Sequence, residues 1–157
     1  MSVTELIETA ERDVWLLSPF VDDSGLAEVE PALGRAIKRG VRVLIMTRHL
    51  GDPKSPNSRL IERLRGCGLG DGRTLRAHHL IIGTGRGRTR ELLHAKVIVT
   101  DEGRQGYVGS LNLTGSSLDD VFEIGVIVGG STALSLAQLI RDLIRASEGT
   151  AANGGMA

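Results

Sequence analysis

The first part of the chain alternates between the apolar spacing of helices and that of strands. Residues 2–11 have the apolar period of an amphipathic helix, and Ser2 or Thr4 is suited to cap its first turn. A short apolar run at residues 14–17 comes next and predicts a buried strand. The pattern therefore predicts a helix that is followed directly by a strand.

A second helix and a second strand continue the pattern. Residues 26–38 predict a helix, in which Pro31 would be tolerated in the first turn of a new segment if the helix were interrupted before it. Gly40 ends this helix, and residues 41–46 predict a strand whose odd-numbered positions are apolar and share one face. Strand, helix and strand in this order form a right-handed parallel crossover, which is the signature of an α/β domain.

The rest of the chain adds further strands and a final helix. We expect an α/β fold in which a mixed, mainly parallel β-sheet is flanked by helices on both faces. The domain is expected to cover residues 1–147, and the small and polar residues 148–157 are expected to form a disordered tail. The other predicted elements are a loop at 47–57, a helix at 58–65, strands at 75–82, 105–108 and 121–128, a basic loop at 83–90, and a helix that Ser131 caps.

The composition indicates a soluble domain with an aliphatic core. The chain of 157 residues has the length of one ordinary domain, and aromatic residues make up only 3% of it, so aliphatic side chains must fill the core. Basic and acidic residues balance at 19 each, which argues against a protein that binds nucleic acid through net charge alone. Cys67 is the only cysteine, which excludes an internal disulfide and favours a reducing compartment. Because no basic leader and no apolar run of membrane-spanning length is present, we expect a cytoplasmic protein that does not contact a membrane.

Polar residues that could take part in catalysis cluster in one stretch of the second half of the chain. His94 and Lys96 are separated by one Ala and run directly into an apolar segment, which predicts that they stand on a β-strand and share one of its faces. Downstream, Ser110 and Asn112 repeat the same two-residue spacing. A nucleophile or base, a fixed positive charge and two neutral donors are the groups needed to attack a phosphodiester and to hold the charge that develops on its oxygens.

This stretch resembles the HKD signature of the phospholipase D superfamily, which includes phospholipases, metal-independent nucleases and tyrosyl-DNA phosphodiesterases. The residues that carry the resemblance are His94-x-Lys96-x-x-x-x-Asp101 and Gly109-Ser110-x-Asn112. Seven residues separate Asp101 from Gly109, one more than in the usual pattern, and we expect the turn-rich residues 102–106 to absorb the extra one. The resemblance implies a phospholipase D-like fold.

The resemblance also implies a mechanism with two copies of the motif, in which one His attacks phosphorus and the other protonates the leaving oxygen. This chain contains one copy, and a symmetric dimer would supply the second, because a two-fold interface brings the same surface of both subunits together. We therefore expect a homodimer in which His94 is the nucleophile and its counterpart is the general acid. Lys96 would bind the non-bridging phosphate oxygens, and Ser110 and Asn112 would donate to the same oxygens or orient the ring.

Two acidic residues complete the candidate catalytic set. Asp101 lies an odd number of residues from Lys96, so on a continuous strand it faces away, and tying down the strand end is its expected role. Glu123 lies within an otherwise apolar segment, where a buried carboxylate needs a partner. The resemblance suggests that this partner is the His94 ring, and the alternative is an ordinary surface glutamate.

Three arginines precede the motif and form the candidate substrate-binding group. Arg86, Arg88 and Arg90 alternate with Gly and Thr, and they are either a solvated loop or a grip on a nucleic-acid backbone. His78 and His79 are adjacent and would point to opposite faces of a strand, so we expect neither a metal site nor a cofactor.

These observations favour one function over two alternatives. The leading interpretation is a metal-independent phosphodiesterase, a small nuclease that cleaves DNA or RNA through a covalent phosphohistidine in a homodimeric site. The first alternative is a phospholipase D that acts on phospholipid, which should show an exposed apolar rim. The second is a non-catalytic nucleic-acid-binding module that works inside a larger defence or restriction assembly.

Overall fold

The computed structural model of the protein describes residues 2–20, 23–50, 52–66, 74–79, 82–84, 88–90, 94–110 and 124–153. In chain order the elements are α1 (Val3–Glu8), β1 (Asp13–Leu17), α2 (Asp23–Lys38), β2 (Arg42–Thr47), α3 (Pro56–Gly66), β3 (Leu75–His79), β4 (Ile82–Thr84), β5 (Arg88–Arg90), β6 (Val97–Thr100), β7 (Gln105–Gly109), β8 (Gly125–Gly129) and α4 (Gly130–Asn153).

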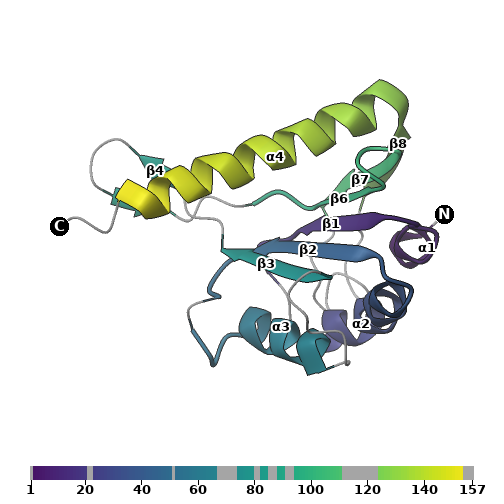
Figure 1. Ribbon diagram of the computed structural model, residues 1–157, viewed down its shortest axis with the longest axis horizontal. Coiled ribbons are helices and arrows are strands. Elements are labelled where there is room, and N and C mark those ends of the chain that lie inside the picture. The colour runs from purple at the N-terminus through teal and green to yellow at the C-terminus, as the bar shows by residue number, and fades with distance from the viewer. Residues whose placement is uncertain are drawn as a thin grey trace.

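A six-stranded sheet in the order β3-β2-β1-β6-β7-β8 forms the centre of the domain. Figure 1 shows α1, α2 and α3 on one face of this sheet and α4 across the other, so the predicted α/β fold with helices on both faces is confirmed. The β1–β2 and β2–β3 pairs are parallel, whereas β1–β6, β6–β7 and β7–β8 are antiparallel. The sheet is therefore mixed, as predicted, with a larger antiparallel part than a mainly parallel sheet would have, because a tight hairpin joins β6 to β7.

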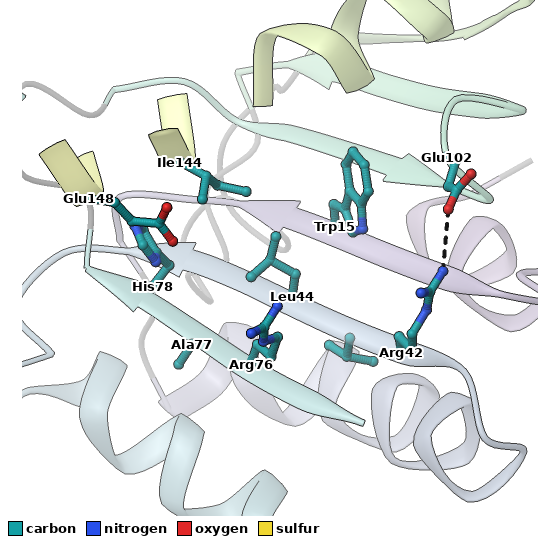
Figure 2. A pocket seen from close by; sticks show the side chains of 10 residues that line it. Trp15, Arg42, Leu44, Arg76, Ala77, His78, Glu102, Ile144 and Glu148 are labelled. Carbon is teal, nitrogen blue, oxygen red and sulfur yellow. Dashed lines mark hydrogen bonds and ion pairs between the residues drawn. The ribbon is translucent and has the colours of Figure 1, made fainter. Parts of the chain in front are cut away.

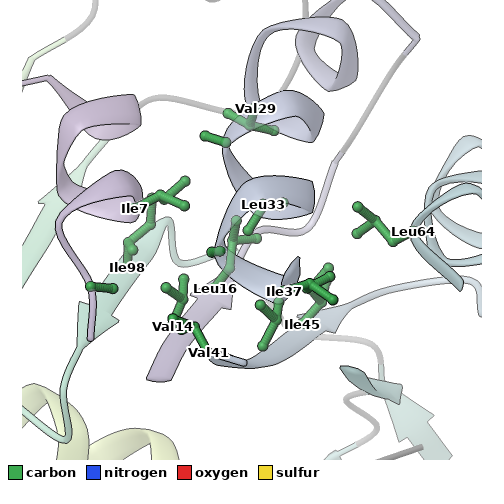
Figure 3. Packing of buried hydrophobic residues seen from close by; sticks show 14 of the residues in the cluster. Ile7, Val14, Leu16, Val29, Leu33, Ile37, Val41, Ile45, Leu64 and Ile98 are labelled. Carbon is green, nitrogen blue, oxygen red and sulfur yellow. The ribbon is translucent and has the colours of Figure 1, made fainter. Parts of the chain in front are cut away.

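The alternation of side chains along the strands divides the core into two layers. On the face covered by α1, α2 and α3, Leu16, Ile45 and Ile98 pack against helix residues such as Leu33 and Ile37, as Figure 3 shows. The opposite face carries a smaller cluster beneath α4, made of Leu17, Met46, Val97, Val99, Ala137 and Ile140. Because neighbouring residues on a strand point to opposite faces, β6 contributes to both layers and is held in place from both sides.

The N-terminal helix begins where one of the two predicted caps lies. The Ser2 hydroxyl accepts the Glu5 backbone N–H at 3.1 Å, and the Glu5 carboxylate accepts the Ser2 N–H at 2.6 Å, which completes a capping box. The hydrogen bond to the Ser2 backbone lowers the pKa of Glu5 below its ordinary value. Ser2 rather than Thr4 is thus the N-cap.

Both α2 and α4 extend beyond their predicted limits. α2 begins before its predicted start and runs through Pro31 without interruption. A proline removes one helical hydrogen bond, and buried neighbours such as Val29 and Leu33 hold this helix on the core despite that loss. α4 runs to Asn153, into the segment 148–157 for which the sequence predicts a disordered tail, because its alanines are good helix formers.

The stretch between β3 and the motif also differs from the prediction. The strand expected at 75–82 ends at His79, and the basic segment 83–90, expected as a loop, includes two short strands. β4 and β5 pair antiparallel, with Ile82 opposite Arg90. Pairing satisfies backbone polar groups that a loop would leave to water, and this gain is not visible in the local composition.

Candidate active site

His94 and Lys96 lie in the segment that leads into β6, just before its first residue rather than on the strand itself. Lys96 nevertheless joins the neighbouring strand, because the Gly109 N–H donates to its carbonyl at 3.2 Å. The Nζ atom of Lys96 lies 3.0 Å from Nε2 of His94, so the two side chains meet as predicted. His94 is exposed, whereas Lys96 is buried, with only 8% of its surface exposed. Ala95, between them, is exposed because the chain has not yet entered the sheet at this point.

The contact between these two side chains relates the tautomer of the imidazole to the charge of the lysine. A lysine ammonium has three N–H donors and no acceptor, so the partner atom in a hydrogen bond must carry a lone pair. When the ammonium donates this hydrogen bond, Nε2 of His94 is the acceptor and the neutral ring carries its proton on Nδ1. An unprotonated nitrogen on an exposed ring, beside a fixed cation, is suited to attack an electrophile that carries negative charge.

The register of the β6–β7 hairpin brings Ser110 to the same end of the sheet. Val97 pairs with Val108, so the chain passes Lys96 as it leaves β7 and reaches Ser110. The turn between β6 and β7, where we expect the extra residue of the motif, lies at the far end of the hairpin. There the backbone is left-handed at three successive residues, Asp101, Glu102 and Gly103.

Ser110 links two strands at this end of the sheet. Its hydroxyl accepts the Ile124 N–H at 3.1 Å and donates to the Ile124 carbonyl at 3.2 Å. The hydroxyl therefore closes the entrance to β8, within the part of the sheet that borders Lys96. Asn112 and Glu123, the other two predicted members of the site, lie outside the described residues.

A neighbouring aromatic ring leaves no space for a side chain at Gly109. A Cβ atom on Gly109 would lie 2.1 Å from the Tyr107 hydroxyl oxygen, and one on Gly125 would lie 2.1 Å from a ring carbon of the same tyrosine. The Tyr107 ring therefore lies across both glycines, and any side chain at these positions would displace it. This packing fixes the strand end from which Ser110 extends.

Asp101 lies at the opposite end of β6, and the structure does not bring it to His94. Its Oδ1 atom accepts backbone N–H groups from Glu11 at 3.0 Å, from Arg12 at 2.8 Å and from Asp13 at 3.4 Å. This buried carboxylate thus ties the start of β1 to the end of β6. The geometry supports the structural role that the sequence predicts for Asp101 rather than contact with a substrate.

Two residues that sequence reasoning missed complete the described part of the site. The Phe20 ring stands edge-on to the His94 ring, with centroids 6.4 Å apart and an interplanar angle of 76°. The Arg48 guanidinium lies 5.4 Å from the centroid of the Phe20 ring. Both residues follow the carboxyl ends of parallel strands, β1 and β2, where α/β sheets place their ligands. Their position after the carboxyl ends of predicted strands could have identified them from the sequence, and the predicted loop at 47–57 contains Arg48.

The comparison with known families agrees with this geometry. The sequence matches the family model described as "Cardiolipin synthase, PLD-like domain" over residues 3–145. The chain belongs to this phospholipase D-like family. The match confirms the phospholipase D superfamily membership that the motif predicted.

Three known proteins resemble this PLD-like domain. The chain is 28% identical over 147 residues to the DISARM protein DrmC of Bacillus paralicheniformis, and the match covers 91% of this chain and 55% of DrmC. The chain thus spans about half of the length of that relative. NucT from Helicobacter pylori superposes with a TM-score of 0.70 at 15% identity, covering 92% of this chain and 85% of NucT. Nuc from Salmonella typhimurium, a phospholipase D family member, superposes with a TM-score of 0.64 at 20% identity, covering 94% of this chain and 84% of Nuc.

The predicted substrate-binding arginines are only partly placed in the PLD-like domain. Arg86 lies outside the described residues, and Arg88 and Arg90 are the first and last residues of β5. Among the described residues, no group of three or more His, Cys, Asp or Glu side chains is arranged to hold a metal ion. Within those same ranges, no helix combines the length and the apolar character needed to cross a membrane.

A groove on the α4 side of the sheet is separate from the motif. It has a volume of about 700 Å³ and is lined by residues of β1, β2, β3 and α4 together with Glu102, which pairs with Arg42 at 3.4 Å, as Figure 2 shows. His78 lies in this groove, where Nε2 of its ring is hydrogen-bonded to the Ser147 hydroxyl. Neither His94 nor Lys96 lines the groove, so the candidate active site lies elsewhere on the PLD-like domain.

Proposed function

We propose that this PLD-like domain is a metal-independent nuclease that cleaves DNA or RNA through a covalent phosphohistidine on His94. The observation that carries the proposal is the 3.0 Å contact between Lys96 Nζ and His94 Nε2, which leaves a lone pair on the nitrogen beside a buried cation. A phosphate that approaches His94 would meet the Lys96 ammonium through a non-bridging oxygen. Nε2 would then be released from its hydrogen bond and face the phosphorus atom.

The proposed reaction has two displacement steps. In the first, the Nε2 lone pair forms a bond to phosphorus, the bond from phosphorus to the leaving oxygen breaks, and a general acid gives a proton to that oxygen. In the second, water attacks phosphorus, its proton passes to the same residue acting as a base, and the phosphorus–nitrogen bond breaks. Lys96 stabilises the charge on the non-bridging oxygens in both steps. Glu123 would accept the Nδ1 proton of His94 in a hydrogen bond and keep Nε2 free for attack.

The general acid is proposed to be His94 of a second copy of the chain. Ile124 and Val126, at the entrance to β8, are 65% and 56% exposed, which is a high exposure for aliphatic side chains. Ile124 is hydrogen-bonded to Ser110 just before β8, and Val126 lies on β8, the last strand of the described sheet. A two-fold contact through this apolar edge would bury these side chains and bring the two motifs together.

Two alternatives each rest on one observation. The exposed apolar side chains of Ile124 and Val126 would also suit contact with a lipid surface, as a phospholipase requires. The resemblance to the DISARM protein DrmC favours a module of a larger defence assembly, in which this domain binds nucleic acid without cleaving it.

One assay separates the three functions. The purified protein is incubated in excess EDTA with labelled DNA, labelled RNA and phosphatidylcholine vesicles, beside His94→Ala and, as a histidine control from the groove, His78→Gln. We expect EDTA-resistant cleavage of nucleic acid that His94→Ala loses and His78→Gln retains. Release of choline instead would support the phospholipase. Binding of nucleic acid without cleavage by all three proteins would support the module and overturn the proposal.

A further inference from the structure

We propose that Phe20 and Arg48 form a nucleotide-binding subsite beside His94, in which Phe20 stacks with one unpaired base and Arg48 binds the phosphate next to the scissile one. The inference rests on the proposed nucleic-acid substrate and assigns it single-stranded form. It begins from the chain of ring contacts that runs from Arg48 through Phe20 to His94.

The exposure of Phe20 is the first argument. This ring is 41% exposed in a protein that has few aromatic residues, whereas Tyr107 is 8% exposed and packs within the core. An aromatic ring left open to water beside a nucleophile offers a flat apolar surface at the place where a substrate must lie. Bases stack on such rings irrespective of their identity, because every base has a π-face.

The charge of Arg48 is the second argument. Its guanidinium lies 5.4 Å from the centroid of the Phe20 ring, on the same chain of contacts that reaches His94. A planar, permanently charged group of this kind suits a phosphate oxygen that is next to the reacting one. A base on Phe20 and a phosphate on Arg48 would together define one nucleotide beside the scissile bond.

The anchoring of both loops is the third argument. The side-chain amide of Asn57, near the start of α3 and only 4% exposed, lies 2.8 Å from the Arg48 carbonyl and 3.3 Å from the Pro19 carbonyl. The Ser18 hydroxyl donates to the Phe20 carbonyl at 2.9 Å. One buried side chain thus holds the two loops together, so Phe20 and Arg48 are positioned before any substrate binds.

This geometry has a consequence for the form of the nucleic acid. In a duplex each base is stacked on its neighbours and paired, so its face is not available to a protein ring. A base that stacks on Phe20 must be unpaired, as in single strands, loops and ends. We therefore expect single-stranded nucleic acid to be cleaved in preference to duplex of the same sequence.

The test compares a single-stranded oligonucleotide with an otherwise identical one that carries abasic residues around the cleavage position. For the wild-type protein we expect kcat/KM to be about tenfold higher with bases present. Phe20→Ala should remove this preference by raising KM for the base-bearing strand, and Phe20→Trp should restore it. If Phe20→Ala lowered cleavage of both strands equally, the ring would only position His94 and the proposed subsite would be wrong.

Arg48 is tested through salt dependence. Arg48→Ala should weaken binding of both strands and reduce the slope of log Kd against log salt by about one, whereas Arg145→Ala, an exposed arginine on α4, should change neither. Binding is measured by fluorescence anisotropy with the His94→Ala protein as background. This measurement gives an answer even if the wild-type protein cleaves nothing, so failure of the nuclease proposal is distinguishable from failure of the subsite. An unchanged salt slope in Arg48→Ala would contradict the phosphate contact.

Discussion

Nζ of Lys96 lies 3.0 Å from Nε2 of His94, so a single phosphate could contact both the imidazole nitrogen and the buried ammonium. In the unbound protein the lysine occupies the lone pair that the proposed reaction uses. A negatively charged phosphate would compete for the ammonium and free that lone pair. Substrate binding and activation of the nucleophile are therefore coupled through one hydrogen bond.

The first prediction concerns this pair. Lys96→Met keeps an unbranched side chain of similar length in the buried position and removes the charge. We expect kcat to fall by about 10²- to 10³-fold, the cost of removing one stabilising donor, while the thermal midpoint of unfolding is maintained or raised. Single-turnover cleavage and thermal unfolding measure the two quantities. A Lys96→Met protein with wild-type kcat would contradict the assigned role.

The second prediction concerns the shared site. Wild-type and His94→Ala subunits are mixed one to one and allowed to exchange. We expect about one quarter of the activity of wild-type protein at the same total concentration, because only dimers with two intact histidines would react. Independent active sites would give about one half of that wild-type activity. The matching control mixes wild-type protein with Arg145→Ala, which lies on α4, and should show no such loss.

The third prediction concerns Asp101, which accepts three backbone N–H groups and has a φ of 52°. Asp101→Ala should lower the free energy of unfolding by about 1–3 kcal/mol, because the buried donors lose their acceptor. Asp101→Asn should be milder, since it keeps an oxygen acceptor and tolerates the left-handed backbone. Urea unfolding measures both. A loss of kcat in folded Asp101→Asn, without a change in stability, would instead indicate a role in catalysis.

The fourth prediction concerns the packing of Tyr107. In Gly109→Ala the added Cβ would lie 2.1 Å from the tyrosine hydroxyl and 2.6 Å from its ring carbon, so the ring must move. We expect a loss of about 1–3 kcal/mol in the free energy of unfolding, as for other overpacked cores, together with reduced activity because Ser110 and the Lys96 carbonyl lie next to this residue. Gly66→Ala is the control, since the added carbon would have no atom within 4 Å beyond its chain neighbours and its own helix backbone. Equal stability of both variants would contradict this account of the packing.

The fifth prediction concerns pH and His78. Burial lowers the pKa of His78 below its ordinary value of 6.5, an effect that the nearby Glu148 carboxylate opposes and that His79 and Arg76 reinforce. As pH falls through 6.5, the unfolded chain takes up this proton before the folded protein does, so stability is complete above that pH and is lost below it. Between about pH 7.5 and about pH 5.5, His78→Gln should therefore lose less unfolding free energy than the wild-type protein. An equal loss in both proteins would exclude His78 as a source of the dependence.

Much of the fold followed from local patterns, and the exceptions have identifiable causes. The strand at Asp13–Leu17 and the helix capped by Ser2 are encoded by neighbouring residues, so their spacing predicted them. The β4–β5 hairpin depends on the pairing of two segments. Local propensity carries no information about that pairing, and the prediction of a loop at residues 83–90 failed there.

For the candidate site, the two-residue spacing of His94 and Lys96 in the sequence predicted that their side chains meet, and they do so in the segment just before β6. Only the tertiary structure decided that Phe20 and Arg48 join His94. Those residues follow different strands, and their proximity depends on the order of strands in the sheet and on the Asn57 amide that holds both loops. Contacts between segments far apart in the chain arise from the packing of the whole domain, and no short pattern of residues records them.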